Sequence, residues 1–119
     1  MRCGASLVTE KHLLTAAHCF VNQKTGQNRK DNSDLHVILG ASDPVNSADG
    51  TERKISEVAQ HPEYAFPEAY FDVAVVTLDK SVPMTTLTTI RPICLPTRAV
   101  EDPGQCFTSN LNFALFHIC

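Results

Sequence analysis

Short apolar runs alternate with turn-forming residues along most of the chain, and this spacing constrains the fold more than any other feature of the sequence. The runs that we expect to form strands are residues 6–8, 13–15, 35–39, 54–60 and 71–78. The first two favour a hairpin around residues 9–11, and the fourth stops at His61-Pro62, because proline cannot continue a hydrogen-bonded strand. This pattern is typical of an all-β barrel or sandwich.

Two longer polar segments, residues 22–34 and 42–51, separate the expected strands and favour surface loops. The acidic residues Asp43, Asp49 and Glu52 lie in or beside the second segment, but their spacing does not define a set of calcium ligands. We therefore expect a solvated loop there, and we predict no metal ion and no cofactor.

The size and charge of the chain limit its class. A chain of 119 residues can bury one modest hydrophobic core. The formal net charge is -3, and no strong cluster of basic residues occurs, so we expect neither nucleic acid nor a membrane surface as a partner. No apolar run approaches the ~20 residues that a transmembrane helix requires.

Five cysteines are many for a short chain, and they lie at positions 3, 19, 94, 106 and 119. There is no Cys-x-x-Cys pair and no His-x₃-His pair, so their spacing does not fit a zinc site. A disulfide-permissive, extracellular setting is favoured instead. The odd number leaves at least one thiol without a partner in the chain.

Two segments carry candidate catalytic residues. The segment Leu14-Thr15-Ala16-Ala17-His18-Cys19 places a histidine among small residues, and Asp72 directly precedes a run that is apolar almost throughout. A lone histidine or a lone strand-end aspartate is usually structural. An aspartate that enters an apolar strand needs a polar partner, however, and His18 is the natural one. Both segments resemble parts of the signature of trypsin-like serine proteases, and residues 90–96 resemble the segment that ends the first barrel of that family.

The resemblance implies an all-β fold: the first antiparallel Greek-key β-barrel of a two-barrel trypsin-like fold, incomplete because the second barrel is missing. It divides the chain into a partial peptidase domain, residues 1–106, and a divergent tail, residues 107–119, that we expect not to be native to the fold. Since the first strand of the barrel is also missing, we expect unpaired strand edges and exposed apolar surface.

The resemblance also assigns roles to single residues. His18 would be the general base, and Asp72 would hold its imidazole in the correct tautomer. Cys3 and Cys19 would form a disulfide. Cys94 resembles a cysteine that bonds a light chain or pro-domain, and Cys106 resembles one whose partner lies in the missing half.

The nucleophile has no candidate. No Gly-Asp-Ser-Gly-Gly segment occurs, and neither Ser6 nor Ser109 has the context of a catalytic serine. We therefore expect a fragment of a serine-type endopeptidase domain, inactive by itself, whose parent cleaves protein substrates in an extracellular setting. The polar segment 22–34 and Cys94 favour a clotting, complement or immune type, and no signal peptide precedes the motifs. The alternative is a non-catalytic secreted homologue that acts as a binding or cofactor module.

Overall fold

The computed structural model describes residues 2–41, 48–83, 90–97 and 113–118, the last of these by their backbone. This part of the chain consists of strands and loops with one short 3-10 helix, which confirms the all-β prediction. In chain order the elements are β1 (Arg2–Leu7), β2 (His12–Thr15), η1 (Ala17–Phe20), β3 (Leu35–Leu39), β4 (Thr51–Gln60), β5 (Ala74–Leu78) and β6 (Phe113–Ile118).

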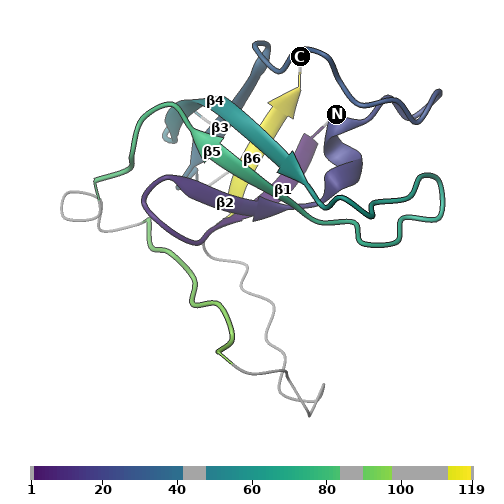
Figure 1. The fold of residues 1–119 in the computed structure, drawn as a ribbon. Helices are drawn as coiled ribbons and strands as arrows, with labels where there is room; N and C mark the ends of the chain where they lie inside the picture. The colour runs from purple at the N-terminus through teal and green to yellow at the C-terminus, as the bar shows by residue number, and fades with distance from the viewer. Residues whose placement is uncertain (1, 42–47, 84–89, 98–112, 119) are drawn as a thin grey trace.

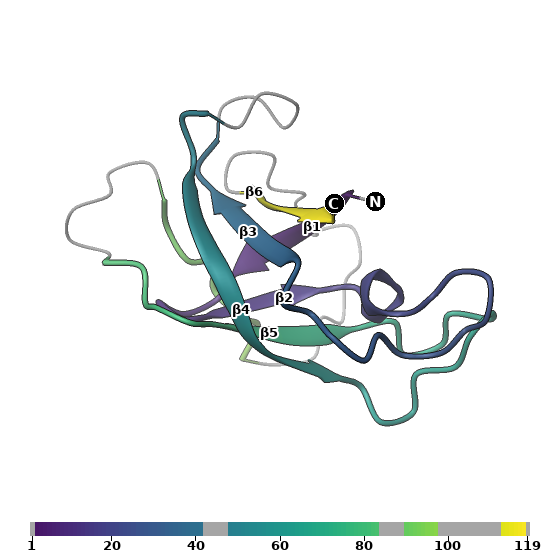
Figure 2. The ribbon, with the colours of Figure 1, turned by 90° about the horizontal axis from the view of Figure 1, so that it is seen from above.

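The six strands close into a barrel in the order β1-β2-β5-β4-β3-β6, and every neighbouring pair is antiparallel. Strand β2 is hydrogen-bonded to β5 rather than to β3, so the connections include the long crossing that distinguishes a Greek key from a simple meander. Figure 1 shows β6 between β1 and β3, and Figure 2 shows the same barrel from above.

Strand β5 is shorter and more exposed than its sequence predicts. It begins at Ala74, and Ala74, Val76 and Leu78 are at most 1% exposed. Val75, between them, is 37% exposed. Successive side chains of a strand point to opposite faces, and one face of a barrel strand points away from the interior. The prediction that residues 71–78 form a strand buried on both faces is therefore wrong.

The barrel interior holds a hydrophobic core to which β1, β2, β3 and β5 all contribute. The largest fully buried side chains are those of Leu7, Leu13, Leu35, Val37, Leu39, Val76, Leu78 and Val82. Two segments after β5 pack along the first hairpin: the Val82 amide donates to the Glu10 carbonyl at 2.7 Å, and the Ile93 amide donates to the Leu7 carbonyl at 2.8 Å. The segment 90–96 therefore lies against the barrel that precedes it in the chain.

The other strands lie where we predicted them, but β1 begins at Arg2, four residues before the predicted start at residue 6, and ends at Leu7. Strand β3 is confirmed at residues 35–39. The first hairpin turns at Thr9, whose hydroxyl accepts hydrogen bonds from the amides of Lys11 and His12. Strand β4 begins at Thr51, inside the loop predicted for residues 42–51, because Thr51 is the register partner of Leu39 at the end of β3.

Strand β6 occupies the place where we expected an open edge. It pairs with β1 from Ser6↔Phe113 to Arg2↔His117 and with β3 along its other side. The expectation of unpaired edges is therefore wrong for β1 and β3, because the C-terminal segment of the chain lies between these two strands and pairs with both. Residues 107–112 and 119 of the predicted tail lie outside the described residues, and its origin outside the fold stays a prediction.

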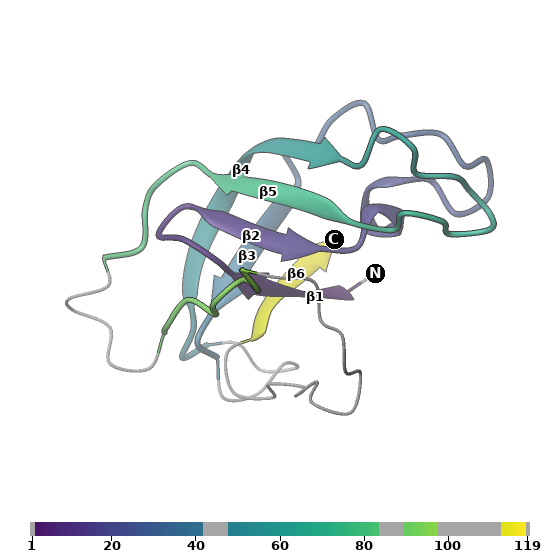
Figure 3. The same ribbon diagram turned by 60° about the horizontal axis from the view of Figure 1, so that its bottom comes forward.

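Two loops, residues 21–34 and 61–73, project from the same end of the barrel, as Figures 2 and 3 show. They meet at Gly26, where a Cβ atom would lie 2.5 Å from Cδ1 of Phe66. Gly26 also has a φ of +68°, a conformation that other residues adopt only with strain. Glycine is thus required there both for the turn and for the contact between the loops.

Neighbouring valines on opposite faces of β5 offer a matched test of the barrel. Val76→Ala should lower the free energy of unfolding by about 2 kcal/mol, because it removes two methyl groups from the core and leaves a cavity. Val75→Ala should change it by less than about 0.5 kcal/mol beyond the difference in strand propensity. Urea unfolding followed by circular dichroism measures both. Equal losses for the two variants would contradict the inward and outward assignment.

Candidate functional site

The pairing of β2 with β5 brings the two predicted catalytic residues to one end of the barrel. Thr15, at the end of β2, is the register partner of Ala74, at the start of β5. His18 lies three residues after Thr15, in η1, and Asp72 lies two residues before Ala74. His18 and Asp72, 54 positions apart in the sequence, therefore lie at adjacent ends of two neighbouring strands.

The short helix η1 sets the direction of the His18 side chain. Ala17 is fully buried and Cys19 is 3% exposed, whereas the side chain of His18 is 45% exposed. The small side chains before the histidine let the chain turn sharply against the barrel, with a bond from the Cys19 amide to the Ala16 carbonyl. The Gln23 side chain donates to the His18 carbonyl at 2.8 Å and ties the following loop to the turn.

A disulfide fixes this turn to β1. Cys3 and Cys19 are bonded, with Cα atoms 6.3 Å apart and a sequence separation of 16, as the resemblance implied. A cross-link that closes a loop of this size stabilises a fold by about 3 kcal/mol in the chain-entropy estimate. The residue next to His18 is thereby attached covalently to the first strand.

Asp72 makes two hydrogen bonds with His18. Its Oδ2 lies 2.6 Å from Nδ1 of the imidazole, and its Oδ1 accepts a bond of 2.8 Å from the His18 backbone amide. The second bond involves no side chain of the histidine, so no sequence motif predicts it directly. Together the two bonds fix the carboxylate plane as well as its distance from the ring.

Opposing effects act on the pKa of Asp72. Burial raises the pKa, but the hydrogen bonds from the His18 side chain and amide, its charge and the Ala17 amide lower it. The net result is a pKa below the ordinary value of 3.8, so the carboxylate is ionised at neutral pH. Burial, and then the charge of Asp72, raise the pKa of the nearby Tyr64 hydroxyl.

The ionised carboxylate determines what the histidine can do. A carboxylate only accepts hydrogen bonds, so in the neutral imidazole the proton resides on Nδ1 and Nε2 keeps its lone pair. The ring can therefore accept a proton at Nε2, and the carboxylate stabilises the imidazolium that forms. Among the described residues, the only side chain hydrogen-bonded to the His18 ring is that of Asp72.

The loop that carries Asp72 exposes two aromatic residues beside it. Tyr70 is 67% exposed and Phe71 is 55% exposed, and the ring of Phe71 stacks on His61 with centroids 4.8 Å apart. Phe71 has a φ of 54°, an uncommon conformation for an aromatic residue. Neither residue was predicted from the sequence, where their only indication is that two aromatic residues directly precede the aspartate.

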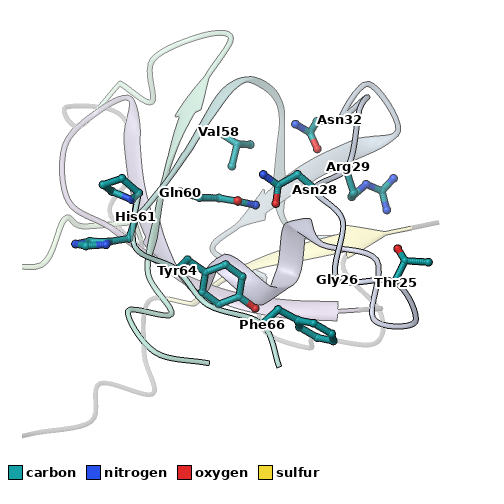
Figure 4. A pocket seen from close by; sticks show the side chains of 11 residues that line it. Thr25, Gly26, Asn28, Arg29, Asn32, Val58, Gln60, His61, Tyr64 and Phe66 are labelled. Carbon is teal, nitrogen blue, oxygen red and sulfur yellow. The ribbon is translucent and has the colours of Figure 1, made fainter. Parts of the chain in front are cut away.

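A polar cavity of about 550 Å³ lies between the two loops and the end of β4 (Figure 4). Its lining includes Asn28 and Arg29 from one loop, Gln60 from the end of β4, and Tyr64 and Phe66 from the other loop. Neither His18 nor Asp72 lines it. The cavity is therefore distinct from the histidine–aspartate pair, and the Arg29 guanidinium at its rim is bonded to Asp34 at 2.6 and 2.7 Å.

Side chains of metal-binding types also gather around the disulfide. The potential ligand atoms of Cys3, His18 and Cys19 all lie within 4.8 Å of one another. The two sulfur atoms are bonded to each other, however, so neither is a thiolate, the form of cysteine that binds metal ions. In the oxidised chain this group offers one imidazole nitrogen.

Comparison with known proteins identifies the family of the chain. The sequence profile of the family described as Trypsin matches residues 1–111. The chain belongs to the trypsin family. Its barrel is accordingly one barrel of the trypsin fold. Its homologues are serine proteases, which are peptidases and therefore hydrolases.

Curated relatives in this family are similar over most of the chain. The suppressor of tumorigenicity 14 protein homolog of Bos taurus is 35% identical over 79% of the chain. The serine protease Hayan of Drosophila melanogaster is 33% identical over 87%, and the proclotting enzyme of Tachypleus tridentatus is 33% identical over 85%. The chain spans 11%, 15% and 27% of the length of these three relatives.

The structure describes only some of the other residues named in the sequence analysis. Cys94 is an exposed free cysteine, and Glu52 lies in β4 rather than in a loop. Asp43, Cys106 and Ser109 lie outside the described residues. No helix within the described residues has the length and apolar character needed to cross a membrane.

The lowered pKa of Asp72 predicts how stability depends on pH. A carboxyl whose pKa is lower in the folded than in the unfolded chain stabilises the fold above its unfolded pKa, and this stability is lost as the pH falls through the folded pKa. Between about pH 5 and about pH 2 the unfolding free energy should therefore fall less in Asp72→Asn than in the unmodified chain. Urea titrations at a series of pH values measure this, with Glu63→Gln, at an exposed position of the same loop, as the control. An Asp72→Asn variant that keeps the full acid dependence would contradict the assigned bonds.

Proposed function

We propose that this chain supplies the acid–base half of a serine endopeptidase active site, with His18 as the general base and Asp72 as the residue that orients it. The observation that carries the proposal is the double attachment of Asp72 to His18, through Nδ1 at 2.6 Å and through the backbone amide at 2.8 Å. A surface ion pair has no need of the second bond, whereas a base that must hold one ring orientation benefits from it.

The chemistry follows from this geometry. Nε2 of His18 would take the proton of a serine hydroxyl as that oxygen attacks the carbonyl carbon of the substrate. Asp72 would stabilise the resulting imidazolium, whose Nδ1–H it already binds. The same Nε2 would then donate its proton to the departing amine, so that one residue serves as base and then as acid.

The nucleophile of this reaction would come from outside the 119 residues. The sequence contains no Gly-Asp-Ser-Gly-Gly segment, and none of the described hydroxyl groups is hydrogen-bonded to the His18 ring. The chain alone would therefore be inactive. We propose in addition that the whole protein acts on protein substrates in an extracellular setting. Cys94 would form a disulfide with a light chain or pro-domain. The exposed thiol of Cys94 supports the disulfide, and the name of one relative, the proclotting enzyme of Tachypleus tridentatus, supports the extracellular setting.

The isolated chain should show no turnover of peptide or ester substrates and no covalent labelling by serine-directed phosphonates, because it lacks both the serine and its oxyanion hole. Mass spectrometry of the phosphonate-treated chain measures the labelling. Stoichiometric labelling that disappears in His18→Ala would show that a nucleophile is present in the chain, contrary to this proposal.

A chimera tests the positive half of the proposal. Residues 3–96 of this chain would replace the matching segment of the Tachypleus proclotting enzyme, which keeps the rest of its own sequence. We expect peptide hydrolysis that is lost in His18→Ala and reduced by about 10⁴-fold in kcat by Asp72→Asn, the size of loss known for this change in such a triad.

His12→Ala in the same chimera is the matched control, because His12 lies in β2 and bonds Thr9 instead of the aspartate. A folded chimera without activity would favour the alternative, a non-catalytic homologue that acts as a binding or cofactor module. Activity that survives Asp72→Asn undiminished would remove Asp72 from the mechanism.

A further inference from the structure

The seam between β1 and β3 is closed by a strand from the far end of the chain. Five register pairs join β6 to β1, and four join it to β3. Leu115 illustrates the arrangement, since it pairs with Gly4 on one side and with Ile38 on the other. Strand β6 is therefore held along both of its edges by main-chain pairing, and Figure 1 shows it enclosed between the two strands.

The register places alternate positions of β6 on the inner face of the barrel. Position 114 is opposite Ala5, and position 116 is opposite both Cys3 and Val37, three residues of the buried core. Register partners lie on the same face of a sheet. The sequence has apolar residues at both positions, alanine at 114 and phenylalanine at 116.

The connection to β6 is long enough to reach another molecule. Fifteen residues, 98–112, separate the described segment 90–97 from β6. Fully extended, they span about 50 Å. The longest dimension of the molecule is 40 Å, so the same strand can reach the seam of its own barrel or that of an adjacent copy.

We infer that the edges of β1 and β3 form a strand-binding slot, and that two copies of this chain exchange β6 through it. The exchanged strand makes the same ladders in the second barrel as in its own, so exchange costs no contacts within the barrel, and protein concentration decides between the two arrangements. The ligand of the slot is an extended apolar segment with the sequence of Phe113–Ile118, recognised by main-chain pairing as in strand addition to a sheet edge.

Cross-linking in the full-length chain tests the exchange. Every cysteine outside the Cys3–Cys19 disulfide is first replaced by serine. One chain then carries Ser6→Cys, and a second chain, with a different tag, carries Phe113→Cys. These positions are register partners, and paired Cα atoms about 4.5–5.5 Å apart suit a disulfide. Mixed at increasing concentration and oxidised, the two chains should form a 6–113 cross-link whose share rises with concentration.

The matched control replaces Phe113→Cys by Ala114→Cys, whose position faces the opposite side of the sheet and pairs with Ala5. It should give no 6–114 cross-link. Leu115→Pro, added to the Phe113→Cys chain, removes a central backbone amide and should abolish the 6–113 product. A chain with both Ser6→Cys and Phe113→Cys should form the cross-link within one molecule at low concentration.

Two results would overturn the inference. If the doubly substituted chain forms no internal 6–113 cross-link, β6 does not occupy the slot. If that cross-link forms but the mixed chains give no 6–113 product, or no more than the Ala114→Cys control gives, the strand is not exchanged between copies.

Discussion

The antiparallel pairing of β2 with β5 is the constraint on which the rest of the structure depends. It makes Thr15 and Ala74 direct neighbours, and a histidine just after the first and an aspartate just before the second are then brought together by the ladder itself. The same pairing carries Leu13 and Val76, two fully buried residues, into the middle of the core. One set of hydrogen bonds therefore builds the hydrophobic interior and sets the distance between the polar groups at its end.

The polar pair is held by several independent restraints. The Cys3–Cys19 disulfide anchors the turn, the amide of His18 fixes one carboxylate oxygen, and the imidazole engages the other. Burial of the carboxylate raises its pKa, and these donors more than offset that effect, so the group remains ionised. Fixed donors around a charged group are what allow a site to stabilise charge without reorganising during a reaction. The exposed ring of His18 is the part left available to other molecules.

The sequence predicts best what short motifs determine. His18, Asp72, Cys3 and Cys19 are identified by their immediate neighbours, and the structure brings each of these pairs together. Burial is harder to predict, because the exposure of Val75 depends on what covers the outer face of the barrel rather than on the apolar run around it. Strand β6 could not be anticipated either. Its pairing depends on two edges that lie about 110 and about 80 residues earlier in the chain, and no local pattern contains that information.

The contact between Gly26 and Phe66 has a consequence for how such a chain can vary. One loop follows the histidine and the other carries the aspartate, and they touch where the glycine leaves no space for a side chain. A larger residue at position 26 would push the aromatic ring and, through the loop, the strand entry that carries Asp72. The residues at positions 26 and 66 are therefore not independent of each other. A substitution at position 26 would have to be matched by a smaller side chain at position 66, so these two positions should change together among descendants of this chain.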